Sequence, residues 1–265
     1  DLLLDYLGLN HLGWVRAAWA RGVDRLPEIL ASDDVIRAVY GRPLFTLEEI
    51  RRLRLLPNEY LQYYYHHDEI LRRLREAPQT RGQAIAELAA RLRAAVQQAV
   101  AKGADPLPAY EAAVFARRSS YMATETGQHR DLAMMGGRVG GGYAQAALDV
   151  IEALRGAEGG ELIVNVPNDG GIDDLAPDDV VEVPCRINPS GPRPRRIGAL
   201  PAAVRELVGR VKNYERSTVA AALGRRWPDA VAALAAHPLV PSTEIATKIA
   251  DEYRRQHAPL FDYLR

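Results

Sequence analysis

The protein has 265 residues, of which 48% are hydrophobic and 26% charged, a globular composition with enough length to bury one large core or two smaller ones. Because 34 Lys and Arg side chains balance 34 Asp and Glu side chains, the composition argues against nucleic acid or an acidic membrane surface as a partner. The sequence has neither an apolar run long enough for a membrane helix nor a signal-peptide pattern, so we expect a cytoplasmic protein.

The cysteine content and the first residues add two expectations. Cys185 is the only cysteine, so an internal disulfide is impossible, and a single thiol fits a reducing compartment. The chain begins at Asp1 with an apolar run and without an initiator methionine, so we expect that further sequence preceded it.

The first segment that could carry chemistry is residues 8–14, Gly-Leu-Asn-His-Leu-Gly-Trp. It places His11 between glycines, on backbone that can come close to a ligand. A single histidine beside Leu and Trp is more often a hydrogen-bonded structural residue, although neutral imidazole is the commonest metal ligand. Both interpretations stay open from the residues alone.

Residues 14–76 are expected to form helices with charged faces. Thr46 followed three residues later by Glu49 matches a capping box, so a helix should begin there. Pro57 then interrupts the pattern, and an aromatic run follows it at residues 60–67.

The tyrosines of this run allow two interpretations. Tyr60 and Tyr64 are four residues apart and would share one helix face, as an ordinary packing stripe does. A tyrosine can act as a general base only if its pKa falls from about 10 toward the working pH, and a nearby metal cation is the strongest cause of such a fall.

A long helix is predicted at residues 81–102, where apolar residues recur every three or four positions. Arg81 at its start could meet an anion together with the helix N-terminus, or it could be a solvated surface arginine. Residues 119–142 are expected to be irregular, and the glycine run at 136–142 lacks the context of a dinucleotide-binding fingerprint.

The remaining chain predicts helix, two strands and helix again. Residues 143–155 have helical spacing, and the apolar strand at 161–166 ends in a dense turn signal before a second strand at 180–187. We expect these strands to pair. Residues 201–264 are again helical, so the predicted class is α+β, mostly helical, with no linker long enough to establish two domains.

Five blocks in chain order carry a family resemblance. They are residues 8–14, Pro-Asn-Glu-Tyr-Leu-Gln-Tyr-Tyr at 57–64, Val-Asn-Val-Pro-Asn-Asp-Gly at 164–170, Val-Glu-Val-Pro-Cys at 181–185 and Val-Lys-Asn-Tyr-Glu at 211–215. In this order they look like the 6-phospho-β-glucosidases of NAD-dependent glycoside hydrolase family 4. The resemblance covers nearly the whole chain and ends at residues 237–240.

The resemblance implies an unusual glycosidase mechanism rather than a pair of carboxylates. In such enzymes NAD⁺ oxidises the C3 hydroxyl of the sugar, a tyrosine removes the C2 proton, and a divalent metal, usually Mn²⁺, stabilises the enediolate. The glycosidic oxygen is then eliminated, water adds back and NADH reduces C3. The implied substrate is a phosphorylated disaccharide or another 6-phosphoglucoside.

The resemblance also implies site residues. His11 takes the position of the metal-ligating histidine, and Asn10 would orient it or meet substrate. Tyr60 is the expected base, with Tyr63 and Tyr64 as alternatives, and Arg81 is expected to bind the 6-phosphate.

Three departures from the family pattern limit these implications. The N-terminal NAD-binding Rossmann domain is absent from this chain, so no NAD site is expected here and the chain alone should be inactive. The cysteine that partners the histidine on the metal belongs to that missing part, and Cys185 lies in a structural strand block. Residues 119–142 also do not match the glycine-serine-tyrosine pattern of the family.

The fold implied by the resemblance is that of the lactate and malate dehydrogenase C-terminal domain, with residues 1–265 as one substrate-binding, metal-binding and oligomerisation domain. We expect exposed apolar residues around positions 2–12, where the nucleotide domain would pack, and a homodimer or larger oligomer. Two alternatives remain: a non-catalytic phosphosugar-binding or regulatory module, and a helical interaction domain.

Overall fold

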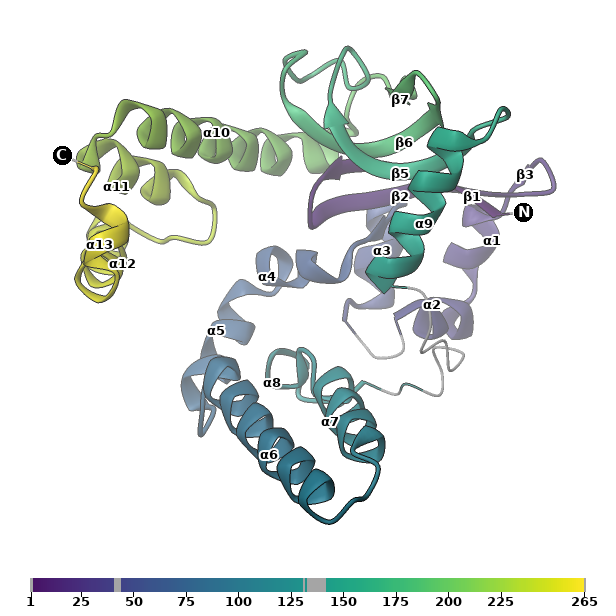
Figure 1. Ribbon diagram of the computed structural model, residues 1–265. Coiled ribbons are helices and arrows are strands. Elements are labelled where there is room, and N and C mark those ends of the chain that lie inside the picture. The colour runs from purple at the N-terminus through teal and green to yellow at the C-terminus, as the bar shows by residue number, and fades with distance from the viewer. Residues whose placement is uncertain (1, 41–43, 131, 133–141, 265) are drawn as a thin grey trace. The chain divides into compact units, whose positions relative to one another are not determined.

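The computed structural model describes residues 2–40, 44–130, 132 and 142–264 (Figure 1). The chain divides into two compact units. The sheet unit comprises Asp1–Leu26, Leu53–Tyr64 and Tyr143–Arg265, and the helical unit comprises Pro27–Arg52 and Tyr65–Gly142. The sequence had shown no linker that would establish such a division.

The first sheet is built around an N-terminal hairpin. Strands β1 (Leu2–Leu9) and β2 (Leu12–Ala20) pair antiparallel, and the short strands β3 (Val23–Asp24) and β4 (Leu56–Pro57) both pair with β2. The prediction of helix from residue 14 onward was therefore wrong for β2. Its alanines permit a helix, but pairing with β1 outweighs that weak local propensity.

The second sheet confirms the two predicted strands. Strand β5 (Gly160–Pro167) pairs antiparallel with β6 (Val180–Asn188), which also pairs with β7 (Gly191–Pro194). Strand β1 packs against β6, so the two sheets share a core. Its fully buried side chains include Leu7, Leu9, Trp14, Val181, Val183 and Ile187.

The predicted turn after β5 is held by one buried amide. Asn168 donates from Nδ2 to the carbonyl oxygens of Ile172, Leu175 and Ala176, and its Oδ1 accepts from the Ile172 N–H. Asp169 and Gly170 take positive φ angles of 43° and 78°, which explains the Asn-Asp-Gly turn signal.

Helices complete the sheet unit, as predicted. Two anchors tie α10 to the strands: Arg216 forms an ion pair with the buried Asp179, and Lys212 Nζ donates to the Val180 carbonyl at 2.6 Å. The helices are α9 (Gly142–Arg155), α10 (Ala202–Gly224), α11 (Trp227–Ala236), α12 (Thr243–Gln256) and α13 (Ala258–Phe261).

The helical unit contains seven helices among its described residues. They are α1 (Leu26–Ala31, which begins in the sheet unit), α2 (Asp33–Tyr40), α3 (Leu47–Leu53), α5 (His67–Glu76), α6 (Arg81–Ala101), α7 (Leu107–Ser119) and α8 (Ala123–Thr126). The predicted capping box of α3 is confirmed, because the Glu49 N–H donates to Thr46 Oγ1 and the Thr46 N–H donates to Glu49. Thr80 and Gln83 form a second box at the start of α6.

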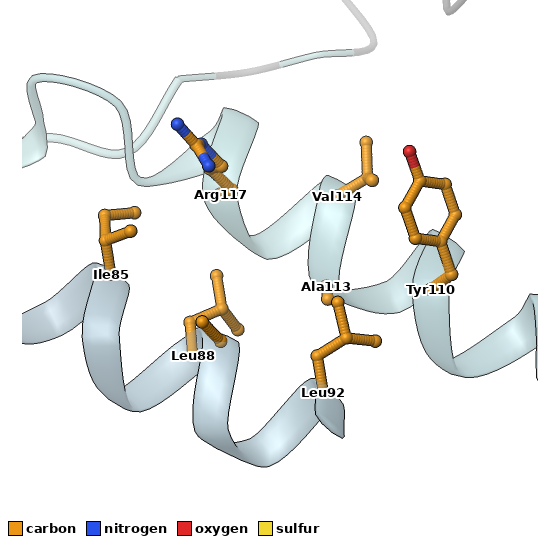
Figure 2. A pocket seen from close by; sticks show the side chains of 8 residues that line it. Ile85, Leu88, Leu92, Tyr110, Ala113, Val114 and Arg117 are labelled. Atoms are coloured by element: carbon orange, nitrogen blue, oxygen red, sulfur yellow. The ribbon is translucent and has the colours of Figure 1, made fainter. Parts of the chain in front are cut away.

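Helices α6 and α7 form a hairpin with an open groove (Figure 2). Neither helix, both of which are fully described, contains a buried side chain. The groove has a volume of about 310 Å³ and is lined by Ile85, Leu88, Ala89, Leu92, Tyr110, Ala113, Val114 and Arg117.

Three further expectations concern the exposed apolar residues, the glycine run and the membrane helices. Leu3 and Leu4 are exposed as predicted, but Leu7, Leu9 and Leu12 are buried, because that end of the hairpin lies in the shared core. The glycine run at 136–142 lies almost entirely outside the described residues. Among the described helices, none is long and apolar enough to cross a membrane.

Candidate functional site

The tip of the β1–β2 hairpin presents the predicted metal ligand. Asn10 and His11 are the two residues between the strands, and both are exposed. His11 has a φ of 62°, in the left-handed region that few non-glycine residues other than Asn, Asp and His adopt. The turn therefore holds an imidazole at a defined place facing solvent.

The glycines on either side of this tip are required by close packing. Gly8 has a φ of 146°, and a Cβ there would overlap the Leu12 carbonyl. A Cβ on Gly13 would overlap the ring and hydroxyl of Tyr6. The glycine spacing that drew attention to this block thus serves the hairpin itself.

The β4 segment brings the aromatic run to the hairpin tip. Pro57 pairs with Trp14, and the Asn58 N–H donates to the Gly13 carbonyl at 2.9 Å. Asn58 then caps the short 3₁₀ helix η1 (Glu59–Leu61), because its side-chain Oδ1 accepts from the Tyr60 N–H at 2.8 Å. Tyr60 consequently lies close to the turn.

The rings of His11 and Tyr60 stack. Their centroids are 4.2 Å apart and their planes are inclined by 14°. Two side chains predicted to serve as metal ligand and general base are therefore in direct contact, both within the sheet unit.

Behind this pair lies a polar cluster that the sequence did not predict. The Tyr6 hydroxyl accepts a long hydrogen bond of 3.5 Å from Asn58 Nδ2 and is also hydrogen-bonded to the Glu182 carboxylate. Burial, the charge of Glu182 and the hydrogen bond to it raise the pKa of Tyr6 far above its usual value, so its phenol stays protonated. Burial also raises the pKa of Glu182, against the opposing effects of the Tyr6 hydrogen bond and the nearby His11.

The two alternative bases have different surroundings. Tyr64 belongs to helix α4 (Gln62–Tyr65) and lies against His237, with ring centroids 6.2 Å apart. Tyr60 belongs to η1, so the prediction that the two tyrosines share one helix face was wrong. Burial, with Tyr214 and Glu215 nearby, raises the pKa of Tyr64, which disfavours the phenolate that a base requires. Tyr63 is half-buried on the same short helix.

Arg81 belongs to the helical unit. Its guanidinium donates to the Ser120 hydroxyl at 2.9 Å and to the carbonyl oxygens of Ser120 and Arg117. These bonds join the first turn of α6 to the end of α7. The predicted phosphate contact of Arg81 stays a prediction.

The described residues do not supply a complete metal site. No group of three or more His, Cys, Asp and Glu side chains suited to a metal occurs among them. Cys185 is fully buried, its thiol donates to the Val183 carbonyl, and burial raises its pKa to about 11, as befits a structural residue rather than a ligand. The exposed His11 offers one imidazole donor to a metal.

Tyr6 and Glu182 are the site-adjacent residues that sequence reasoning missed. Glu182 lies within one of the five blocks and Tyr6 lies two residues before another, but alternation along a strand does not show which polar atoms will meet. Their meeting depends on the packing of β1 against β6.

Comparison with known proteins connects this geometry to a family. Residues 6–240 match the family 4 glycosyl hydrolase C-terminal domain. The 6-phospho-beta-glucosidase of Escherichia coli is 30% identical over 266 residues, covering 97% of this chain and 53% of that protein. A phospho-alpha-glucosidase of Clostridium acetobutylicum is 25% identical over 269 residues, covering 94% of this chain and 54% of that protein.

Solved structures show the same fold. A 6-phospho-beta-glucosidase of Thermotoga maritima, solved with NAD and glucose-6-phosphate, superposes with a TM-score of 0.73 at 24% identity, covering all of this chain and 56% of that one. Another crystal of that enzyme also contained manganese. The chain thus spans about half the length of the relatives that it matches. It belongs to glycoside hydrolase family 4, and its α+β fold is that of the C-terminal domain of those enzymes.

Proposed function

We propose that this chain is the C-terminal part of an enzyme that hydrolyses 6-phospho-β-glucosides with NAD and Mn²⁺. The observation that carries the proposal is the stack of His11 on Tyr60, because it joins the two residues expected to bind metal and to remove the C2 proton. The family match supports the glycosidase class.

The proposed roles follow from where the side chains lie. His11 offers its exposed imidazole as one metal donor, and Asn10 lies beside it on the same turn, where it can orient that ring or meet the sugar. Tyr60 would accept the C2 proton, and Arg81 would bind the 6-phosphate. A bound divalent cation supplies a Lewis acid for the sugar oxygens and favours the ionised form of a nearby phenol.

The β anomer is preferred on similarity. The 6-phospho-beta-glucosidases of Escherichia coli and Thermotoga maritima are 30% and 26% identical to this chain, whereas the phospho-alpha-glucosidase of Clostridium acetobutylicum is 25% identical. Because these values are close, the anomer has to be tested directly.

The decisive experiment supplies the part that binds NAD. Hydrolysis of nitrophenyl 6-phospho-β-glucoside, with Mn²⁺ and NAD⁺, is measured for this chain alone and for this chain joined to the nucleotide-binding half of the Escherichia coli relative. We expect turnover only in the joined protein, and faster turnover of the β than of the α glycoside.

Two controls make the result interpretable. The complete relative must be active under the same conditions, and circular dichroism must show that the joined protein is folded. If the folded joined protein binds glucose-6-phosphate in calorimetry but turns over neither anomer, the enzyme proposal fails and a phosphosugar-binding module takes its place.

A further inference from the structure

A chain of hydrogen bonds runs from Glu182 on β6 to Tyr60, whose ring stacks on His11. The Glu182 carboxylate accepts from the Tyr6 hydroxyl, and that oxygen in turn accepts from Asn58 Nδ2. Asn58 Oδ1 accepts from the Tyr60 N–H at 2.8 Å. Three separate segments, β6, β1 and the residues after β4, thus meet at the base of the stack.

The direction of these bonds is fixed at every step. A carboxylate can only accept, so Tyr6 donates to Glu182 and offers its lone pair to Asn58. The Asn58 amide then faces Tyr6 with its nitrogen and Tyr60 with its oxygen. If the Tyr6 oxygen were absent, the Tyr60 N–H would be the only member of this chain of bonds that still holds the Asn58 amide, so the amide and Tyr60 would be fixed less closely.

Packing makes Tyr6 a rigid part of this chain. Its ring lies so close to Gly13 that a Cβ there would overlap it, and Gly13 also accepts the Asn58 N–H through its carbonyl. The same glycine therefore positions both Tyr6 and Asn58. His11, on the hairpin tip, lies two residues before Gly13 in the sequence.

We propose that Tyr6 and Glu182 are positioning residues, which act through the side-chain amide of Asn58 to hold Tyr60 in its stack on His11. They do not touch the reacting atoms. The consequence for catalysis rests on the proposed function, whereas the positioning itself is a property of this chain alone.

The positioning is tested by the ring-proton chemical shifts of His11, which the stacked Tyr60 ring displaces upfield. The histidine signals of the complete chain are assigned with His11→Gln, and Tyr60→Leu gives the shift of an unstacked His11. We expect Tyr6→Phe, which keeps the ring over Gly13 but removes its hydroxyl, to lose most of the upfield displacement. Unchanged His11 shifts in Tyr6→Phe would overturn the proposal.

Variants of Asn58 and Glu182 separate positioning from general loosening. Asn58→Asp removes the donor to Tyr6 but offers an oxygen to the Tyr60 N–H in either orientation, so it should keep the stack. Asn58→Ala removes that oxygen and should resemble Tyr6→Phe, and the double variant of Tyr6→Phe with Asn58→Ala should lose no more than either single one. Glu182→Gln keeps an acceptor for Tyr6 and should preserve the stack, whereas Glu182→Ala should not. Additive losses in the double variant would contradict a shared chain of bonds.

A matched control is Tyr40→Phe, which removes a hydroxyl from a half-buried tyrosine in the helical unit. It should leave the His11 shifts unchanged, and equal losses in Tyr40→Phe and Tyr6→Phe would overturn the proposal. Thermal unfolding of each variant confirms that the spectra describe folded protein.

Activity of the joined protein gives a separate readout. Tyr6→Phe should lower kcat about tenfold with little change in KM, because a displaced base affects the chemical step more than binding. If the unsubstituted joined protein is inactive, the proposed function fails while the His11 shifts still decide the positioning. If it is active and Tyr6→Phe loses the stack without losing kcat, the catalytic part of the inference is wrong.

Discussion

The strands of the sheet unit and the two long helices of the helical unit bury their side chains to very different extents. In the sheet unit, β1, β2 and β6 each contribute side chains that are fully buried. In the helical unit, the long helices α6 and α7 contain no buried side chain. The candidate base and metal ligand lie in the sheet unit, where non-local packing sets positions closely, whereas α6 and α7 depend on local signals such as capping.

The largest expected difference between the units concerns activity. In the joined protein, His11→Ala should remove the dependence on Mn²⁺ and lower kcat by about 1,000-fold, since a Lewis acid contributes several kcal/mol. His129→Ala changes an exposed histidine of the helical unit and should have no effect. Retained Mn²⁺ dependence in His11→Ala, measured by metal titration of the initial rate, would remove His11 from the site.

The next difference concerns the core. Trp14→Ala should lower the free energy of unfolding by about 4 kcal/mol, because Trp14 is fully buried between its neighbours. Leu88→Ala in the open groove should cost only about 1 kcal/mol, because Leu88 is half-exposed. Urea unfolding followed by circular dichroism measures both, and equal losses would show that α6 and α7 are covered in solution.

A matched pair of glycines sharpens the comparison. Gly13→Ala should destabilise the protein by about 3 kcal/mol, because the new Cβ overlaps Tyr6 within packed strands. Gly82→Ala in the first turn of α6 meets only Thr80, at an ordinary distance of 3.8 Å, and should stabilise that helix by up to about 1 kcal/mol. Unfolding followed by tryptophan fluorescence reports the effect of Gly13→Ala, because Trp14, Trp19 and Trp227 all lie in the sheet unit.

The smallest expected difference is in the response to acid. Burial, and then Arg210, lower the pKa of His237 in the sheet unit, so its contribution to stability is complete above about pH 6.5 and is lost as the pH falls through the lowered value. In the helical unit burial alone would raise the pKa of Glu49, but hydrogen bonds from Thr46 and His66 outweigh it and lower the pKa.

The contribution of Glu49 is therefore complete above about pH 4.5 and is lost only below that pH. On acidification, hydrogen exchange should increase first around His237 and later at the start of α3. His237→Gln should abolish the first step and leave the second. The reverse order would show that the two groups do not have these pKa directions in solution.

The sequence predicts the elements that depend on local signals better than the elements that depend on pairing with distant strands. The capping box of Thr46 and the long helix that begins at Arg81 were predictable, because each depends on interactions between residues only three or four positions apart. Strand β2 was read as helix because its partner β1 supplies the decisive hydrogen bonds, and local propensity does not include them. Strands β5 and β6 were predicted because a clear turn signal separates two apolar runs.

The candidate site was predicted in part, and for a different reason. His11 and Tyr60 came from a family resemblance, and the structure brings them together. Tyr6 and Glu182 could not be foreseen, because their hydroxyl and carboxylate become partners only when two sheets pack. Arg81 was predicted from its place in the sequence either to meet an anion or to be a solvated surface arginine, and in the helical unit it donates to Ser120 and Arg117, so its phosphate contact stays a prediction.

The close approach of Tyr6 to Gly13 has a consequence for how this hairpin can change over evolutionary time. A side chain at position 13 cannot coexist with a phenol at position 6, because both would occupy the same space. Replacing Gly13 alone therefore destabilises the hairpin, whereas a smaller residue at position 6 creates no overlap, so a change at position 6 should come before a change at position 13. Among related sequences, we expect any residue larger than glycine at position 13 to accompany a small residue at position 6.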